Sequence, residues 1–256
     1  MIHLKTKAEI KVMQEGGKIL AVILKKIAQE VRPGITTKEL DKLARELVLF
    51  YNVKSGFLGY GGYPAALCTS VDDEVVHCVP SERVLKEGEL VSLDMGIVYK
   101  GFNLDHAVTI PVLGSLSYTE WVKKNPELNH LLETTKAALS AGIKNAKPGN
   151  PVGMIGSAVQ AIVETAGFGV VRELVGHGVG KSLHEEPHVP NFGSGSEGPK
   201  LKEGMVIAIE PMVTMGDWRL VGGKDNFTYR TKDGSRAAHF EHTVAITSGG
   251  PVVLTK

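Results

Sequence analysis

The stretch Leu85–Asp94 reads LKEGELVSLD, and Leu201–Glu210, which lies 116 positions later, reads LKEGMVIAIE. Both stretches share their first four residues, continue as an apolar run and end on a carboxylate. A second pair follows the same plan, because Asp105–Ile110 (DHAVTI) is similar to Glu241–Ile246 (EHTVAI). The sequence therefore predicts two related halves, each of which contributes two acids to strand-like sequence.

Helical patterns repeat at nearly the same offset. Apolar residues at helical spacing, together with a capping box at Thr36-x-x-Glu39, predict helices over residues 6–31, 36–50, 127–146 and 151–166. The first and third helices end at Pro33-Gly34 and Pro148-Gly149, which are 115 positions apart. An internal duplication explains all of these matches; the alternative is that two common turn sequences, Pro-Gly and Glu-Gly, coincide by chance.

The predicted fold class is α+β. Each half would consist of two helices followed by antiparallel strands, with the two sheets forming one curved surface covered by helices. We expect a single catalytic domain over 1–256, with halves at approximately 1–120 and 126–256. The segment Gly114–Pro126 is expected to connect the halves, and the Gly- and Ser-rich segment Asn191–Pro199 to form a surface loop.

The composition excludes several classes of protein. The chain has 256 residues, 43% of them hydrophobic and 22% charged, which is typical of a globular protein. A net charge of +1 argues against a nucleic-acid-binding surface as its main function. The amino terminus is unlike a secretory signal, and the apolar run Ile19–Leu24 is too short to span a bilayer. Two cysteines, Cys68 and Cys78, indicate neither a disulfide framework nor a structural zinc site, so a cytoplasmic protein is expected.

Asp94 and Asp105 lie on two strands predicted to form a hairpin near Tyr99–Gly101. Because their numbers differ by an odd number, any even-length turn places both carboxylates on the same face, with Cβ atoms about 5 to 8 Å apart. Such a pair is destabilising unless a cation lies between the acids or one of them is protonated. The alternative is a hairpin whose acids face solvent. By the repeat, Glu210 and Glu241 should face each other in the same way.

His177 lies in Gly176–Gly180 (GHGVG), where glycines allow the imidazole to approach a metal closely. A lone histidine in a glycine loop is more often a turn residue, so its interpretation as a ligand depends on the four acids. His77 is a weaker counterpart in the first half. Metal roles for His239 or His242 are open, but the repeat does not prompt them.

The sequence His184–His188 (HEEPH) fits the zincin pattern H-E-x-x-H, which requires a helix. Pro187 lies inside the pattern and restrains Glu186 away from helical geometry. We therefore reject a zincin site. His188 is interpreted as structural, whereas His184 remains a candidate for a role beside the metal.

Five residues in chain order, Asp94, Asp105, His177, Glu210 and Glu241, resemble the metal ligands of the methionine aminopeptidase family, which belongs to metallopeptidase family M24 and has the pita-bread fold. The resemblance covers essentially the whole chain and includes Gly59–Pro64 (GYGGYP), Asp73–His77 (DEVVH), Gly176–Gly180 (GHGVG), His184–Pro187 (HEEP), Ala208–Pro211 (AIEP) and Phe240–Thr243 (FEHT). The short gap between His184 and Glu210 is similar to that of the type I, bacterial-like branch.

The resemblance implies an enzyme, a dinuclear metal-dependent aminopeptidase that removes the initiator methionine from nascent proteins and peptides and prefers a small second residue. A metal-bridging water or hydroxide would attack the first peptide bond. Two divalent ions are implied, and the mixed nitrogen and oxygen donors suit Co, Mn, Fe or Zn rather than Ca. Asp94 would bind one ion, Asp105 and Glu241 would bridge both, and His177 and Glu210 would complete the other.

Roles for further side chains follow from the same resemblance. Glu210 would also carry the proton of the attacking water, His184 would polarise the scissile carbonyl, and His77 would contact the substrate peptide. The implied methionine pocket consists of Phe57, Tyr60, Tyr63, Cys68, Leu183 and Trp218, with His77 and His184 beside it. Ordinary core or loop packing is the alternative for these six side chains.

Three positions depart from the usual family pattern, namely Cys78, His106 and Leu183. None of them removes a ligand, although His106 beside Asp105 could modulate the metal. The implied partners are nascent polypeptide N-termini and, transiently, the ribosome. No specific nucleic-acid sequence and no membrane are expected as partners, and the protein is expected to be monomeric.

Two rival functions stay open. One is a hydrolase of the same fold that cleaves X-Pro peptides or creatine; such relatives generally carry a separate amino-terminal domain, for which 256 residues leave no room. The other is a non-catalytic binding protein that has kept the fold. Proteins of that kind usually lose ligands, whereas all five are present here.

Overall fold

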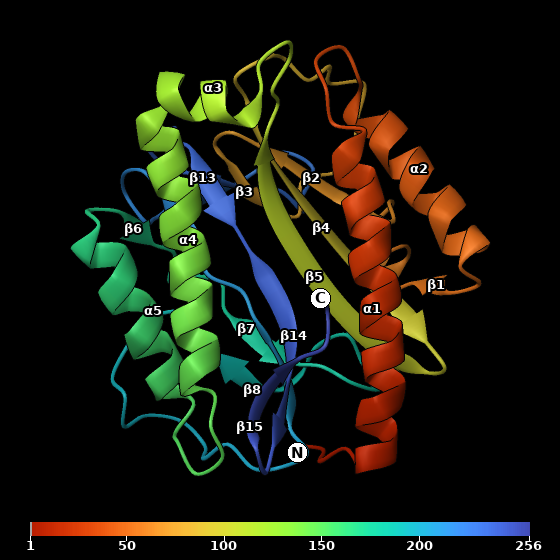
Figure 1. The fold of residues 1–256 in the computed structure, drawn as a ribbon, viewed down its shortest axis with the longest axis vertical. Coiled ribbons are helices and arrows are strands. Elements are labelled where there is room, and N and C mark those ends of the chain that lie inside the picture. Colours follow the sequence, from red (N-terminus) through yellow and green to blue (C-terminus); the bar gives the residue numbers. More distant parts are fainter. Residues whose placement is uncertain (1) are drawn as a thin grey trace.

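The computed structural model describes residues 2–256, and its long helices cover one face of a twisted sheet (Figure 1). The helices are α1 (Lys7–Gln29), α2 (Thr37–Phe50), α3 (Tyr118–Lys124), α4 (Pro126–Asn145) and α5 (Gly153–Thr165), with a 3-10 turn, η1, at Tyr60–Gly62. None of these described helices is long and apolar enough to cross a membrane.

The main sheet has nine strands, and its central order is β1-β4-β5-β14-β9-β7-β8, with β2 paired to β4 and β15 paired to β14. Their bounds are β1 (Lys54–Ser55), β2 (Cys68–Val71), β4 (Leu90–Tyr99), β5 (Phe102–Pro111), β7 (Gly176–Gly178), β8 (Glu185–Val189), β9 (Val206–Ile209), β14 (Glu241–Thr247) and β15 (Gly250–Val253). The strand pairings of this sheet within residues 2–256 are all antiparallel, as expected from the sequence.

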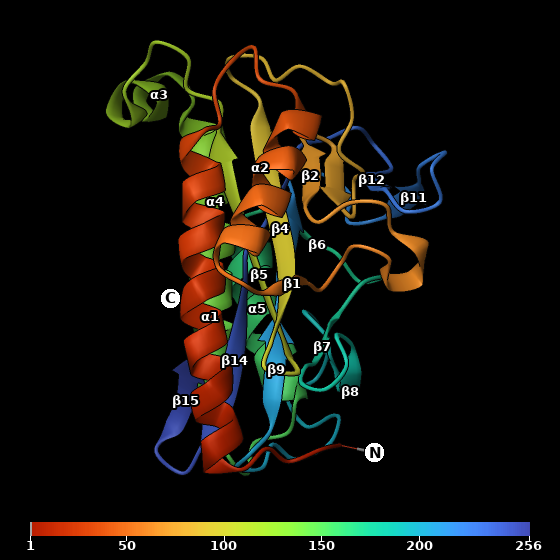
Figure 2. The same ribbon diagram turned by 90° about the vertical axis from the view of Figure 1, so that its right-hand side faces the viewer.

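Two three-stranded sheets complete the structure, in the orders β13-β10-β6 and β11-β12-β3. Their strands are β3 (Glu74–Val76), β6 (Gly169–Val170), β10 (Met212–Thr214), β11 (Leu220–Gly222), β12 (Tyr229–Thr231) and β13 (Ala237–His239). Figure 2 shows α1, α3 and α4 on one side of the main sheet, and β7, β8, β11 and β12 on the other. The face opposite the helices is therefore where loops and short strands gather.

The four predicted helices are confirmed, and local capping explains where two of them begin. The Thr6 and Thr36 side chains accept the N–H groups of Glu9 and Glu39, whose carboxylates in turn accept the N–H groups of the two threonines. Each capping box satisfies backbone donors that the first helical turn leaves unpaired. The segment Asn191–Pro199 has no helix or strand, as predicted for a loop.

The connection between the halves contains a helix that the sequence reading did not predict. α3 follows Ser117, which forms a third capping box with Glu120, and its Trp121 is fully buried. The helix has only seven residues, so it shows less than two full periods of apolar spacing. The Ser-x-x-Glu pattern at 117–120 was the signal that could have revealed it.

Apolar packing follows the two halves. One buried cluster joins α1 to the first hairpin and includes Leu20, Leu24 and Leu93, while the other joins α4 and α5 to β9 and β14 and includes Leu132 and Ile207. α1 packs against β4 and β5, and α4 packs against β9 and β13. From this parallel we propose that the chain is one catalytic domain made of two halves.

The hairpin β4–β5 is confirmed, and its turn has the even length that places Asp94 and Asp105 on one face. Tyr99 pairs with Phe102, which leaves Lys100 and Gly101 as a two-residue loop with φ values of 47° and 81°. Positive φ at both positions is the geometry of a type I′ turn, which fits the twist of a hairpin. Gly96 pairs with Asp105, so Asp105 lies one diagonal step from Asp94 on the same face.

Candidate metal centre

Four carboxylates converge where β4, β5, β9 and β14 lie side by side; those of Asp94, Asp105 and Glu241 are buried, and that of Glu210 is partly exposed. Asp94 and Asp105 come from the first hairpin, and Glu241 begins β14, where it pairs with Ala107 of β5. Glu210 follows the last residue of β9, and since His242 pairs with Ile209, one further step in that register brings Glu241 opposite Glu210. The second pair of acids is thus directly opposed, whereas the first is diagonal.

His177 lies beside these acids on β7. Its Nδ1 is 2.9 Å from the Gly178 carbonyl oxygen, which can only accept, so Nδ1 carries the proton and donates. The unprotonated Nε2 then faces Glu210 Oε1 at 3.5 Å and Asp105 Oδ2 at 4.0 Å. This tautomer is the one that a metal ligand requires, because a lone pair is turned towards the carboxylates.

The donor set fits divalent metal ions. One ligand atom each from Asp105, His177 and Glu241 lie within 4.8 Å of one another, and all three residues are buried. Asp94 Oδ1 and Glu241 Oε1 are buried without a hydrogen-bond partner among the described residues. Buried carboxylate oxygens without donors are costly, and a cation would satisfy them. The oxygen-rich set with one imidazole suits borderline metals such as Mn, Fe, Co or Zn.

Electrostatics give the same result. Burial, and in addition the negative charges of Asp105 and Glu210, raise the pKa of Asp94 well above its ordinary value. The pKa of Glu241 is also raised well above its ordinary value, by burial and by the negative charges of Asp105, Glu210 and Asp94. Burial raises the pKa of Asp105 and of Glu210 to about 8, with Glu210 adding to the effect on Asp105. Four acids in this state need either protons or metal cations.

The metal-free protein should therefore lose stability as the pH rises from about 7 to about 9. The carboxyl groups of Asp105 and Glu210 have a pKa near 4 when unfolded and about 8 when folded. Their contribution is complete below the unfolded pKa and is lost as the pH passes the folded pKa. A loss of about 2 kcal/mol would lower the melting temperature by roughly 4–8 °C.

Thermal denaturation of chelator-treated protein at several pH values measures this effect, and added Co²⁺ should reverse it most at the highest pH. The matched variant is Asp105→Asn, which removes one of the titrating groups and should flatten the pH dependence. A melting temperature that stays constant or rises over this range would contradict the assignment of four mutually repelling acids.

A cleft of about 670 Å³ opens directly from the four acids and His177. Next to the acids it is lined by an apolar cluster that includes Phe57, Tyr63, Cys68 and Leu183, all nearly inaccessible to solvent. The Phe57 and Tyr63 rings meet edge to face with centroids 6.4 Å apart. The cluster forms an apolar slot beside a charged centre.

Of the eight predicted substrate-binding residues, seven line this cleft: Phe57, Tyr60, Tyr63, Cys68, His77, Leu183 and His184. Trp218 does not, because its indole packs against the guanidinium groups of Arg172 and Arg219, at 4.9 and 5.2 Å from the ring centroid. The sequence reading missed Phe227 and Met212, which line the cleft. Phe227 packs edge to face on Tyr63 with centroids 5.3 Å apart, a contact that no sequence motif signals.

His184 projects from the loop before β8 into the cleft. Its Nδ1 lies 2.7 Å from the Tyr60 hydroxyl oxygen, and its ring lies 4.2 Å from that of His177, centroid to centroid. Within the pattern HEEPH, His184 lies in the loop and the other four residues lie in strand β8, with no helix, so the rejection of a zincin site is confirmed. His188 pairs with His177 across β7 and β8 and lies exposed at the edge of the cleft.

The loop that carries His184 is held at both ends. Lys5 forms a buried ion pair with Glu185, with Nζ and Oε2 2.7 Å apart, and the other Glu185 oxygen accepts the Ser182 N–H. The Asn103 amide donates to the carbonyl oxygens of Gly180 and Lys181, each at 3.1 Å. The amino-terminal segment and β5 thus fix the loop next to the acids.

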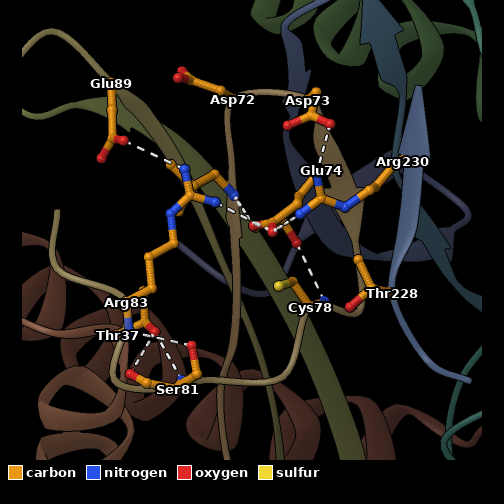
Figure 3. Close-up of polar contacts among 12 residues, drawn as sticks. Thr37, Asp72, Asp73, Glu74, Cys78, Ser81, Arg83, Glu89, Thr228 and Arg230 are labelled. Atoms are coloured by element: carbon orange, nitrogen blue, oxygen red, sulfur yellow. Dashed lines mark hydrogen bonds and ion pairs between the residues drawn. The ribbon is translucent and has the colours of Figure 1, made fainter. Parts of the chain in front are cut away.

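His77 follows β3 directly and has a left-handed backbone, with φ of 60°. β3 is anchored by the buried carboxylate of Glu74, whose Oε1 lies 3.2 Å from Arg83 Nη1 and 2.6 Å from Arg230 Nη2. Figure 3 shows Glu74 between these two guanidinium groups. Tyr229, next to Arg230 on β12, faces the His77 ring with centroids 6.0 Å apart. The Glu74 cluster therefore fixes both His77 and the strand of its aromatic neighbour.

Two histidines of the strands that carry the acids stack on each other. The rings of His106 and His242 are nearly parallel, with centroids 4.6 Å apart. His106 Nδ1 contacts the Glu241 carbonyl oxygen at 2.5 Å, and His242 Nδ1 lies 2.9 Å from Thr255 Oγ1. His106 thus bonds to the backbone of a strand that bears an acid; its influence on a metal stays a prediction.

Comparison with known proteins places this geometry in a family. The model of metallopeptidase family M24 matches residues 11–248. Methionine aminopeptidase 1 of Bacillus subtilis is 44% identical over 256 residues, which cover all of both chains. The crystal structure of methionine aminopeptidase from Thermotoga maritima also has 44% identity and superposes with a TM-score of 0.92, again over all of both chains.

More distant structures share the fold alone. The prolidase of Pyrococcus horikoshii has 23% identity and a TM-score of 0.73, and this chain spans 63% of it. The predicted pita-bread fold is thereby confirmed. From the family model, the full-length relative and the superposed structure together, it follows that this chain belongs to metallopeptidase family M24 and, within it, to the methionine aminopeptidases.

Proposed function

We propose that this protein removes the N-terminal methionine from peptides and nascent chains, with Asp94, Asp105, His177, Glu210 and Glu241 holding two divalent metal ions. The observation that carries the proposal is the direct continuity between the five ligand side chains and an apolar slot in one cleft. A methionine side chain is unbranched and apolar, so it fits a slot of this kind. The scissile bond would then lie over the charged centre.

Metal ions bound here would supply Lewis acidity and lower the pKa of water to about 7. In the arrangement that we propose, Asp94 and Asp105 of the first hairpin would hold the ions together with His177, Glu210 and Glu241. The raised pKa values of the acids support this assignment, because carboxyl groups with such pKa values stay ionised near neutral pH only when a positive charge lies close to them. The metal used in the cell is one of Co, Mn, Fe and Zn.

The remaining roles belong to groups of the chain itself. Glu210 accepts a proton from the attacking water and passes it to the leaving amine, a role that its place in the cleft beside His177 allows. His184 donates a hydrogen bond to the scissile carbonyl oxygen from Nε2, since its Nδ1 is engaged with Tyr60. His77, on the other side of the cleft, contacts the peptide beyond the methionine.

The apolar slot provides the specificity for methionine. Phe57, Tyr63, Cys68 and Leu183 enclose it, and Phe227 closes it on the side of β12. Cys68 is fully buried, and burial together with the nearby Asp94 raises the pKa of its thiol well above the ordinary value. Cys68 therefore contributes as a neutral, apolar wall and not as a nucleophile.

The predicted partners extend this proposal. The relatives' name indicates removal of an N-terminal methionine, and we propose nascent chain ends as the substrates of this protein. We propose action on them in the cytoplasm, as a monomer in transient association with the ribosome, with a small second residue preferred in the substrate.

A peptide assay tests the proposal. The Co²⁺-reconstituted protein should release methionine from Met-Gly-Ser, and replacing the methionine by alanine should lower kcat/KM by about tenfold to a hundredfold, because one buried apolar side chain is lost. Met-Leu-Ser should be a poorer substrate than Met-Gly-Ser. Chelator-treated protein serves as the control and should release no methionine.

Activity on the dipeptide Gly-Pro distinguishes a methionine aminopeptidase from the rival hydrolase that cleaves X-Pro peptides. Cleavage of Gly-Pro without release of methionine from Met-Gly-Ser would refute the proposed substrate. A protein that binds Co²⁺ and peptide but cleaves neither would instead be the non-catalytic relative.

A further inference from the structure

His239 has no role in the proposed mechanism, and its side chain is unusual in its surroundings. The residue ends β13, immediately before the acid-bearing strand β14, and is 1% exposed. Its backbone is firmly held, because its N–H donates to the Thr109 hydroxyl oxygen and its carbonyl oxygen accepts from the same hydroxyl, both at 2.8 Å. Neither ring nitrogen has a hydrogen-bond partner among the described residues.

An unpaired imidazole is a costly side chain for a buried position. A neutral ring offers one donor and one acceptor, and both remain unused here although the site excludes solvent. An apolar residue of similar size would avoid this cost. A fully buried polar group without a partner in a folded protein calls for an explanation, and a role in a catalytic or ion-binding site is one of the recognised explanations.

The carboxylate of Glu210 lies close to the His239 ring. His239 Nε2 lies 3.6 Å from Glu210 Oε2, whereas the other carboxylate oxygen, Oε1, lies 3.5 Å from His177 Nε2. The Glu210 carboxylate is thus flanked by two imidazoles. His177 belongs to the proposed ligand set and faces Oε1, whereas His239 faces Oε2, the oxygen on the other side of the carboxylate.

We infer that His239 is a positioning residue for Glu210: its Nε2–H donates to Glu210 Oε2 and so keeps Oε1 turned towards the metal centre. The separation of 3.6 Å exceeds a hydrogen bond of about 2.7–3.2 Å, so a movement of about half an ångström by either side chain forms the bond. Hydrogen bonds that orient a metal-binding carboxylate in this way raise metal affinity. The inference rests on the proposed metal centre.

His242, three positions further on, does not offer the same contact. Its ring stacks on that of His106, and its Nδ1 is paired with Thr255 Oγ1. Its partly exposed side chain is therefore already satisfied away from Glu210. This makes His242 a suitable comparison on the neighbouring strand.

Titration calorimetry of metal-free protein with Co²⁺ alone tests the inference. His239→Leu should bind Co²⁺ about tenfold to a hundredfold more weakly than the wild type. His239→Gln, which keeps a side-chain N–H donor, should restore most of the affinity. The melting temperature of metal-free His239→Leu should equal or exceed that of the wild type, because an unpaired buried polar group has been removed.

At saturating Co²⁺, His239→Leu should have a lower kcat with KM little changed, since Glu210 and not the methionine slot is affected. His242→Gln should bind Co²⁺ within about threefold of the wild-type affinity. Wild-type affinity in His239→Leu, or an equal loss in His242→Gln, would overturn the inference. Failure of the wild type itself to bind Co²⁺ would instead remove the metal centre and, with it, the proposed function.

Discussion

Replacing His177 by alanine should lower kcat/KM for Met-Gly-Ser at least a thousandfold. His177 is the one nitrogen donor of the proposed ligand set, and its Nε2 is already turned towards Glu210 and Asp105. Losing the metal ion that it helps to hold removes a contribution of several kcal/mol to the transition state, and each 1.36 kcal/mol corresponds to about tenfold. Steady-state kinetics after reconstitution, with metal analysis of the same samples, measure the effect.

The variant should also retain less metal, because the neutral imidazole donor is missing while the four acids continue to repel one another. His188→Ala is the matched control, since His188 pairs with His177 across β7 and β8 but lies exposed at the cleft edge. Its activity should stay within a few-fold of the wild type, as is usual for exposed positions. Full activity in His177→Ala would refute the ligand assignment.

Replacing His184 by alanine should lower kcat by about a hundredfold to a thousandfold without loss of metal. The imidazole is placed to donate to the developing oxyanion, and its orientation is set by the contact of Nδ1 with the Tyr60 hydroxyl at 2.7 Å. A donor of this kind acts mainly on the transition state, so KM should change much less than kcat. Steady-state peptide assays at saturating Co²⁺ measure kcat and KM separately, and metal analysis of the same samples measures the bound metal.

Tyr60→Phe tests how the orientation is achieved. It removes only the hydroxyl that contacts His184 and should therefore cost less activity than His184→Ala. If His184→Ala loses metal to the same degree as His177→Ala, then His184 acts as a ligand and not as a donor to the carbonyl. An unchanged kcat would exclude it from the reaction altogether.

Much of the fold could be predicted because its signals are local. The helices at 7–29 and 37–50 begin at capping boxes and keep apolar periodicity over three turns or more. For any even-length turn, parity places Asp94 and Asp105 on the same face, since a strand alternates its faces at every residue, whereas the exact register came from the structure. α3 was missed because seven residues show too little periodicity, and its burial depends on Trp121, which fits between segments distant in sequence.

The candidate site was predictable to a different extent. Acids that interrupt apolar strands could be recognised one by one, because a buried charge is costly unless it is paired. The placing of Trp218 in the pocket rested on resemblance, and its indole instead packs between two arginines. Phe227 and Met212 line the cleft through contacts that cross from the second half to the first, and no local pattern encodes such contacts.

His239 shows the same limit most clearly. Its position in the chain, two residues before Glu241, does not distinguish a solvated strand end from a buried one. Only the packed structure shows that its ring nitrogens are buried without partners and that one of them faces Glu210. The distance between two side chains 29 positions apart depends on how β10 and β13 pair, because Met212 and His239 are partners in that ladder.

The sequence by itself determined the duplicated plan, the four main helices, the hairpin that holds Asp94 and Asp105, and the identity of the acids. These features depend on interactions between residues close in the chain or on a periodicity that a strand or helix imposes. The tertiary structure alone decided which nitrogen of His177 is unprotonated, which side chains close the methionine slot, and that His239 lies next to Glu210. Those features depend on distances of a few ångströms between distant segments, which are set by packing and not by local preference.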